Sequence, residues 1–221
     1  MPKRPIDGPF RMCISDCFKG GMSGSSTVTV SGRIESGGVQ VGDSVLIMPS
    51  NLVASVKSMD MNSDSVKWGV AGDTCMVTLT GVEITAVGPG FILCDPERPV
   101  PVTTHFQARV VTFDLTIPLI PGVPVVFHHQ SLTEPGTICK MDALLDRTTG
   151  EVIKKKPRVL TKNVAALVEI KVDRPVCVEL FRDVKGLGRF TLRNESMTVA
   201  AGIVTEILVY EKGRAVEEVK D

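Results

Sequence analysis

Stiff β-branched side chains dominate this sequence, and they constrain its fold more than any other feature. Valine, threonine and isoleucine together contribute 63 of the 221 residues, whereas alanine and leucine, both strong helix formers, contribute only 25. A β-branched side chain loses rotamer freedom in a helix and packs well on a pleated sheet. The composition therefore predicts an all-β fold.

Short segments in which apolar and polar residues alternate support the same fold class. Within residues 27–35, the apolar Val28, Val30 and Ile34 alternate with polar residues, which is the period of a half-buried strand. Turn signals rich in glycine, proline and aspartate separate such segments at the spacing of sandwiches and barrels. Further strands are expected at residues 11–15, 44–48, 74–79, 107–113, 123–127, 165–172, 176–181 and 198–208.

A proline-rich segment predicts the domain boundary. Residues 95–101 hold three prolines, which cannot donate a hydrogen bond to a sheet and which stiffen the chain. We expect four parts: a β domain at residues 1–95, a linker at 96–101, a second β domain at 102–211 and a charged tail at 212–221.

Charge, hydropathy and cysteine usage exclude several classes of protein. The 25 Lys and Arg residues balance the 25 Asp and Glu residues, so any RNA contact must use a local patch. The longest uncharged stretch, residues 115–133, is interrupted by three prolines and is not expected to cross a membrane. Residues 1–10 lack the apolar region of a secretory signal, and six scattered cysteines do not suggest a disulfide scaffold. We expect a cytoplasmic protein.

Motifs that carry catalysis are missing from the sequence. A Walker A phosphate loop needs a Gly-Lys dipeptide, and the sequence has none; it also has no Gly-x-Ser-x-Gly elbow. The glycine-rich residues 20–26 are interpreted as a hairpin loop, with a phosphate cradle as the less favoured alternative. The expected function is therefore binding rather than catalysis, without a cofactor in this chain.

Two pairs of residues in the sequence have side chains that can bind a metal ion. Cys13 and Cys17 have a zinc-like gap and would share one face of a regular strand, but a second ligand pair is missing. His128 and His129 are adjacent, so on a strand their rings point to opposite faces and cannot bind one metal together. We expect packed or half-exposed thiols, one partly buried histidine and no metal site.

A cluster of five cations in nine residues stands out against the neutral background. It admits three interpretations: a solvated loop, a contact with ribosomal RNA phosphates, or a contact with an acidic protein patch. The cluster consists of Lys154, Lys155, Lys156, Arg158 and Lys162.

A second basic segment covers residues 188–193. On a strand, Phe190 and Leu192 would face the core, while the residues between them would face outward. Because arginine is favoured at protein interfaces, the segment is either a barrel strand with a charged face or a strand that docks a partner. Its residues are Gly188, Arg189, Phe190, Thr191, Leu192 and Arg193.

Several segments of the first predicted domain resemble a known family. Residues 32–37, Gly-Arg-Ile-Glu-Ser-Gly, together with Val-Gly-Asp at residues 41–43, resemble the second domain of translational GTPases of the elongation factor 1-alpha type. Residues 9–12 and 90–96 match the same family.

The resemblance continues through the second predicted domain. Residues 188–193 and 198–204 are similar to the closing strands of the third domain of these factors, so the resemblance spans residues 9 to about 210. It implies two consecutive small β-barrels, the translation-factor domain II barrel and a C-terminal domain III barrel, which in the family follow a GTP-binding domain. GTP and magnesium belong to that other domain, and we expect a C-terminal fragment or a shortened form that neither binds nor hydrolyses GTP.

Within the family, residues 154–162 are most similar to the ribosome-rescue branch, the Hbs-type factors whose partner is Pelota. The close alternative is the eukaryotic class II release factor, which acts in translation termination with the class I release factor. The lysine-rich segment and the neutral overall charge lead us to expect that the module docks Pelota in no-go decay. We also expect the module to be monomeric.

The resemblance also implies roles for individual residues. The segment that contains Arg33 and Glu35 matches the one that contacts the tRNA acceptor end in elongation factors, in a barrel that also touches small-subunit rRNA. A rescue factor carries no aminoacyl-tRNA, so Glu35 has the alternative role of a hairpin residue. The strand at residues 188–193 matches the segment that docks the tRNA-shaped partner, with Arg189, Phe190 and Arg193 as the main candidates.

Overall fold

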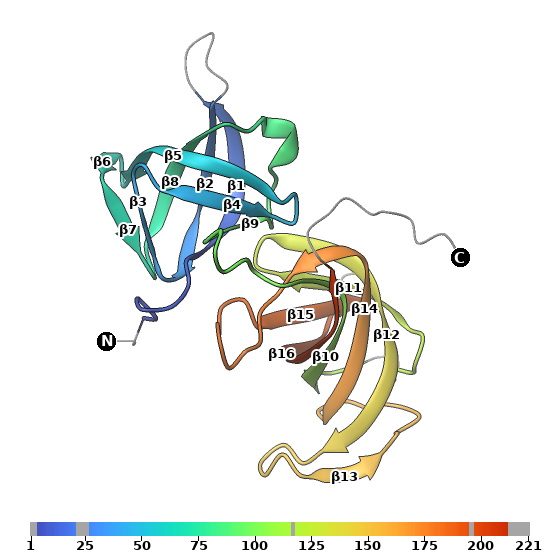
Figure 1. Cartoon of the computed structure of the whole chain (residues 1–221). Coiled ribbons are helices and arrows are strands. Elements are labelled where there is room, and N and C mark those ends of the chain that lie inside the picture. The colour runs from blue at the N-terminus through green and yellow to red at the C-terminus, as the bar shows by residue number, and fades with distance from the viewer. Residues whose placement is uncertain (1–3, 21–26, 116–117, 195–196, 212–221) are drawn as a thin grey trace. The chain divides into compact units, whose positions relative to one another are not determined.

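The structure is a computed structural model that describes residues 4–20, 27–115, 118–194 and 197–211. The described chain divides into two compact units, the first ending at Val102 and the second running from Thr103 to Glu211 (Figure 1). Residues 21–26 of the glycine-rich loop and the charged tail at 212–221 lie outside the described residues. Each unit is described by itself.

The first unit is a closed barrel of six antiparallel strands. The hydrogen-bonded order is β4-β9-β1-β2-β8-β5, and pairing of β4 with β5 closes the barrel. Its strands are β1 (Arg11–Gly20), β2 (Thr27–Ser36), β4 (Ser44–Met48), β5 (Leu52–Met61), β8 (Thr74–Thr80) and β9 (Ile92–Cys94). Outside the closed barrel lie β6 (Asp64–Val66), the ribbon of β3 (Gly38–Gln40) with β7 (Trp68–Val70), and the short turn η1 (Ile84–Ala86).

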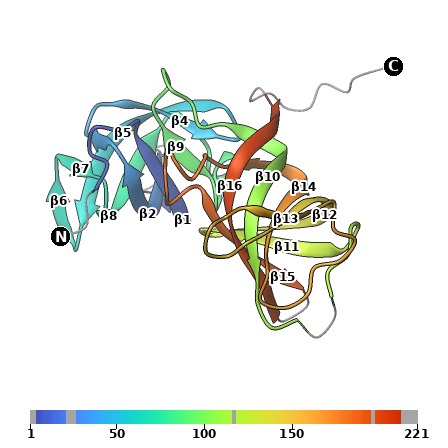
Figure 2. The same ribbon diagram turned by 90° about the horizontal axis from the view of Figure 1, so that it is seen from below.

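The second unit is a barrel of six strands in the order β11-β15-β16-β10-β14-β12, which the pairing of β11 with β12 closes. Its strands are β10 (Val102–Thr112), β11 (Pro124–His129), β12 (Leu132–Leu145), β14 (Ala165–Cys177), β15 (Arg189–Asn194) and β16 (Met197–Glu211). A short seventh strand, β13 (Val152–Lys155), pairs with β12 outside the barrel, and Figures 1 and 2 both show it beside β12. The predicted all-β fold of two small barrels is therefore confirmed.

The alternation of side chains accounts for these strands. In β2, Val28, Val30 and Ile34 are buried, as their spacing predicts. In the second barrel, the rings of Phe106 and Phe127 lie in the core with their centroids 5.4 Å apart. Each barrel thus encloses one apolar core filled by alternate residues of its strands.

One strand prediction was wrong, and the barrel strands β5 and β12 were not predicted. The strand expected at residues 176–181 ends at Cys177, because the chain turns at residues 180–184, where the Val184 amide donates to the Leu180 carbonyl. Strand β12 contains Pro135 and Gly136, a dipeptide that is typical of a turn. In the structure, Pro135 lies within the strand opposite Val126.

The proline-rich segment at residues 95–101 contains no strand. The Glu97 amide donates to the Asp95 carboxylate at 2.9 Å, and the Arg98 amide donates to the Asp95 carbonyl at 3.1 Å. The buried Arg11 guanidinium donates to the Arg98 carbonyl at 2.7 Å, which holds this turn against the start of β1. Among the described residues, no helix is long and apolar enough to cross a membrane.

Candidate partner-docking surface on the second barrel

Strand β15 shows the alternation that the sequence predicts. Phe190 and Leu192 are buried, whereas Arg189 is exposed and Thr191 and Arg193 are half-buried. The strand lies between β11 and β16, so its backbone is paired on both sides. It can therefore present three side chains outward from a rigid support.

Phe190 anchors the strand in the core. Its ring centroid lies 5.1 Å from that of Phe127 and 5.8 Å from that of Phe106, at tilted and edge-on angles that aromatic pairs favour. Phe190 is only 4% exposed. Of the three main candidates, Phe190 thus supports the surface and does not itself face a partner.

The start of the strand depends on a close approach of two backbones. A Cβ on Gly188 would collide with the backbone of Phe181, so only glycine fits there. This contact places the Phe181 ring under Arg189, whose guanidinium carbon lies 5.1 Å from the ring centroid. The aromatic face attracts the cation and holds it at the surface.

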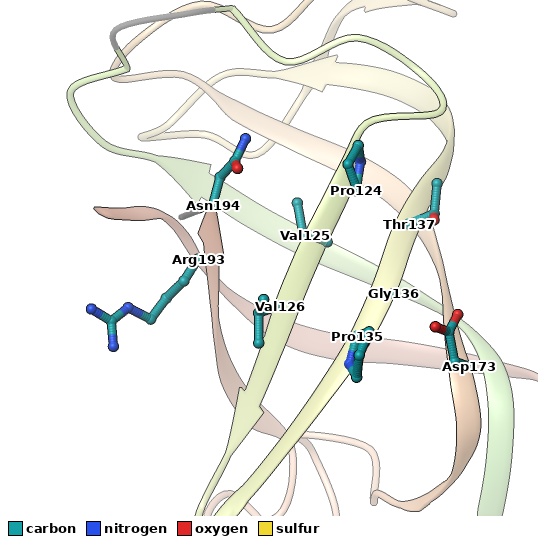
Figure 3. A pocket seen from close by; sticks show the side chains of 9 residues that line it. All are labelled: Pro124, Val125, Val126, Pro135, Gly136, Thr137, Asp173, Arg193 and Asn194. Atoms are coloured by element: carbon teal, nitrogen blue, oxygen red, sulfur yellow. The ribbon is translucent and has the colours of Figure 1, made fainter. Parts of the chain in front are cut away.

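Arg193 borders a shallow hollow of about 270 Å³ on the outer face of the barrel. Figure 3 shows Arg193 on one side of this hollow and Asp173 on the other, with Val126 and Pro135 between them. Figure 3 also shows the Arg193 side chain extending away from Val126 and Pro135, so the hollow offers an apolar floor with charged residues of opposite sign at its two edges. Its lining consists of Pro124, Val125, Val126, Pro135, Gly136, Thr137, Asp173, Arg193 and Asn194.

The two histidines of β11 face opposite sides, as predicted. His128 pairs with Thr191 of β15, and its Nδ1 lies 3.0 Å from the Thr133 hydroxyl. Partial burial and the charge of Arg193 lower the pKa of His128. His129 is buried beside Phe127, and its Nε2 donates to the Leu187 carbonyl at 3.0 Å, while burial lowers its pKa to about 4.

The lysine cluster lies at a different place on the second barrel. Lys154 and Lys155 belong to β13, and all five cations of the cluster are exposed. Along β12, Pro135 pairs with β11 and Ala143 pairs with Lys155. These eight residues of strand correspond to roughly 25 Å. The structure therefore does not bring the lysines together with the β15 surface.

Arg33 and Glu35 lie on β2 of the first barrel. The Arg33 Nε is 3.7 Å from the Glu35 carboxylate, and the Arg33 side chain is 61% exposed. The Glu35 side chain is only 15% exposed, so it is mostly buried, whereas the Arg33 side chain projects outward. A single ion pair with an exposed arginine contributes little to stability.

The cysteine prediction was wrong in one respect. A bulge between Ile14 and Asp16 shifts the alternation of β1, so Cys17 packs with Met12 and Ile14 against the barrel core, while Cys13 does not. Burial raises the pKa of the Cys13 thiol. Within the described ranges, no three His, Cys, Asp or Glu side chains gather closely enough to hold a metal ion.

Sequence reasoning missed the residues of other strands that line the hollow beside Arg193. Val126, Pro135 and Asp173 reach the hollow from three different strands, and the barrel closure between β11 and β12 brings them together. Their spacing along the chain carries no signal of this contact.

Comparisons with known proteins match both units. Residues 28–94 match the family described as "Elongation factor Tu domain 2", and residues 105–205 match "GTP-eEF1A C-terminal domain-like". "Protein HBS1" of Drosophila melanogaster is 47% identical over 207 residues, which cover 94% of this chain and 30% of that protein. "Elongation factor 1-alpha" of Pyrobaculum aerophilum is 35% identical over 206 residues, which cover 93% of this chain and 46% of that protein.

A solved structure of sup35 complexed with GDP also resembles the chain. Its TM-score is 0.84 at 30% sequence identity, and the match covers 93% of this chain and 49% of that one. The chain thus spans between about a third and a half of the length of the proteins it matches.

Proposed function

Because this chain belongs to the elongation factor 1-alpha-like translational GTPases, of which it contains the domain II barrel and the C-terminal barrel, we propose that it is the module that docks Pelota during the rescue of stalled ribosomes. In this proposal the module is monomeric, cytoplasmic and non-catalytic. The alternative partner is the class I release factor, in which case the module acts in translation termination.

The outward face of β15 is the observation that carries the proposal. Arg189 is presented over the Phe181 ring, and Arg193 borders an apolar hollow with Asp173 on its far side. Arginines and central apolar contacts contribute much of the binding energy in protein interfaces. The same face therefore offers both the charge and the apolar pocket that a folded protein partner needs.

The comparisons support the choice of the rescue branch. The identity to "Protein HBS1" is 47%, against 35% to the elongation factor 1-alpha of Pyrobaculum aerophilum and 30% to sup35. Each match runs over nearly the whole chain. The partner of the chain is inferred from this branch and from the β15 surface together.

The residues of this chain do not fit GTP or magnesium. The sequence lacks the Gly-Lys dipeptide that a phosphate loop requires. Within the part of the chain that the structure describes, no carboxylate cluster could hold a cation. We therefore derive no catalytic step from these barrels.

What the barrels contribute is orientation. Phe190 and Leu192 fix β15 in the core, so Arg189 and Arg193 hold their positions without ordering a flexible segment on binding. A preformed surface loses little conformational entropy when a partner docks. In the proposal, this rigid docking holds Pelota in a fixed place until the GTPase part of the factor releases it.

The remaining candidates would contact RNA or a partner protein. By family resemblance, the segment with Arg33 and Glu35 is a candidate for an RNA or partner contact, in a barrel that would also touch small-subunit rRNA. The exposed Lys154, Lys155 and Lys156 are too far along β12 to join the β15 surface. We therefore expect these lysines to affect the salt dependence of Pelota binding more than the binding free energy of the β15 contact.

Parallel capture with the purified chain tests the choice of partner. Immobilised chain is incubated with purified Pelota or purified class I release factor, at low and at physiological salt. Greater retention of Pelota supports the proposal, and preferential retention of the release factor replaces it with the termination function. A variant with Lys154, Lys155 and Lys156 changed to Ser is included, and an unchanged salt dependence would exclude the lysines from the contact.

A further inference from the structure

Strand β13 is an exposed edge of the second barrel. It lies at the end of the strand order, and within the described residues only β12 pairs with it. All four of its residues are exposed, among them the aliphatic Val152 at 53% and Ile153 at 63%. Aliphatic side chains so exposed on an edge strand are unusual, because such edges promote pairing with other chains.

The hydrogen bonds of β13 show which backbone groups face away from the barrel. The Lys156 amide donates to the Asp142 carbonyl at 2.8 Å, and Lys155 pairs with Ala143. Backbone groups of successive residues in an antiparallel pair point alternately toward the partner strand and away from it. The amide and carbonyl of Lys155 are therefore directed outward, where another strand could pair with them.

The charge beside this edge is strongly positive. Lys154, Lys155, Lys156 and Arg158 are exposed, and none of them takes part in a salt bridge among the described residues. Only one carboxylate, that of Glu151, lies within residues 150–163. The cations are thus available to a negatively charged partner.

These features favour one kind of partner over two others. A second copy of this chain would bring an equal number of exposed lysines to the edge and only one carboxylate, Glu151, within residues 150–163, so most of the cations would gain no opposite charge. Single-stranded RNA is bound through aromatic stacking as well as charge, and residues 150–163 contain no aromatic side chain. An extended protein segment can use the backbone edge, the aliphatic side chains and the lysines together.

We propose that β13 is a strand-addition site for an extended acidic segment of another protein. The added strand hydrogen-bonds to the outward backbone groups of Lys155, places carboxylates opposite Lys154 and Lys155, and places aliphatic side chains opposite Val152 and Ile153. This site is separate from the β15 surface and does not depend on which tRNA-shaped partner docks there.

A labelled synthetic peptide with a central Glu-Glu-Val-Ile sequence is the probe, and fluorescence anisotropy measures its binding to the purified chain. We expect saturable binding that weakens as salt is raised. Reversing two cross-strand ion pairs in the double variant Lys154→Glu/Lys155→Glu should weaken binding about tenfold. Lys171→Glu, which reverses an exposed lysine of β14, is the matched control and should bind the peptide as the unchanged chain does.

Two further measurements separate strand addition from simple charge attraction. Methylation of the central backbone amides of the peptide keeps its charges but removes its strand hydrogen bonds, so binding should be lost. Amide hydrogen exchange at Lys155 should slow when the unmodified peptide is bound. Failure of the peptide to bind, equal binding of the methylated peptide, or tighter binding of a uridine oligonucleotide than of the peptide would each overturn the proposal.

Discussion

Substitutions in β15 should separate the residues that hold the strand from those that it presents. Phe190 is 4% exposed and contacts two core rings, so Phe190→Ala should cost about 3 to 5 kcal/mol in the unfolding free energy of the second barrel. Arg189→Ala removes one cation–π contact at the surface, which is worth about 0.5 to 1 kcal/mol. The loss of unfolding free energy should therefore be larger for Phe190→Ala than for Arg189→Ala by at least about 2 kcal/mol.

Thermal unfolding followed by circular dichroism measures this difference. For a domain of this size, 1 kcal/mol shifts the Tm by about 4 °C or more, so Phe190→Ala should lower the Tm by at least roughly 12 °C. Arg189→Ala and Arg193→Ala should each lower it by no more than a few degrees. Arg147→Ala, at an exposed turn after β12, is the control for the loss of a surface arginine.

The same variants are then tested for Pelota binding. Arg189→Ala and Arg193→Ala should weaken it, since arginines at the centre of an interface can contribute about 2 kcal/mol or more. Arginine variants that lose as much Tm as Phe190→Ala would show that these side chains are structural. The assignment of β15 as a presenting strand would then be refuted.

Two other predictions concern GTP binding by the chain and the pH dependence of the second barrel's stability. Calorimetry with GTP and Mg²⁺ should show no binding, because the sequence has no Gly-Lys dipeptide; binding in the micromolar range would contradict this. His129 has a pKa near 6.5 when unfolded and about 4 when folded, so the unfolded state binds the extra proton between these values. The stability of the second barrel should therefore fall as the pH drops from about 6.5 to about 4, by up to about 3 kcal/mol, and His129→Phe should flatten this dependence in urea titrations.

Sequence reasoning was most successful where a strand follows a regular alternation. On both β15 and β2, apolar residues alternate with polar or charged ones, so one face of each strand is apolar and packs into the core. The buried residues include Phe190, Leu192, Val28 and Val30. The same rule failed at β1, where a bulge after Ile14 reverses the faces of the following residues. A bulge depends on pairing with a distant strand, so it cannot be predicted from the local sequence.

The hollow beside Arg193 could not be predicted for a related reason. Pro135 and Gly136 indicate a turn by themselves, but the closed barrel extends β12 through them, and Gly136 lies against the Lys171 carbonyl, where a Cβ would not fit. Asp173 reaches the same hollow from β14. Only the closure of the barrel brings these residues to Arg193.

The central claim is that the outward face of β15 docks Pelota. Isothermal titration of purified Pelota into the chain and into the double variant Arg189→Ala/Arg193→Ala tests it most directly, with Arg147→Ala as the control. We predict binding to the chain and to the control, and a loss of at least about tenfold in affinity for the double variant, which corresponds to 1.4 kcal/mol. Equal affinity of Pelota for all three proteins would contradict the claim.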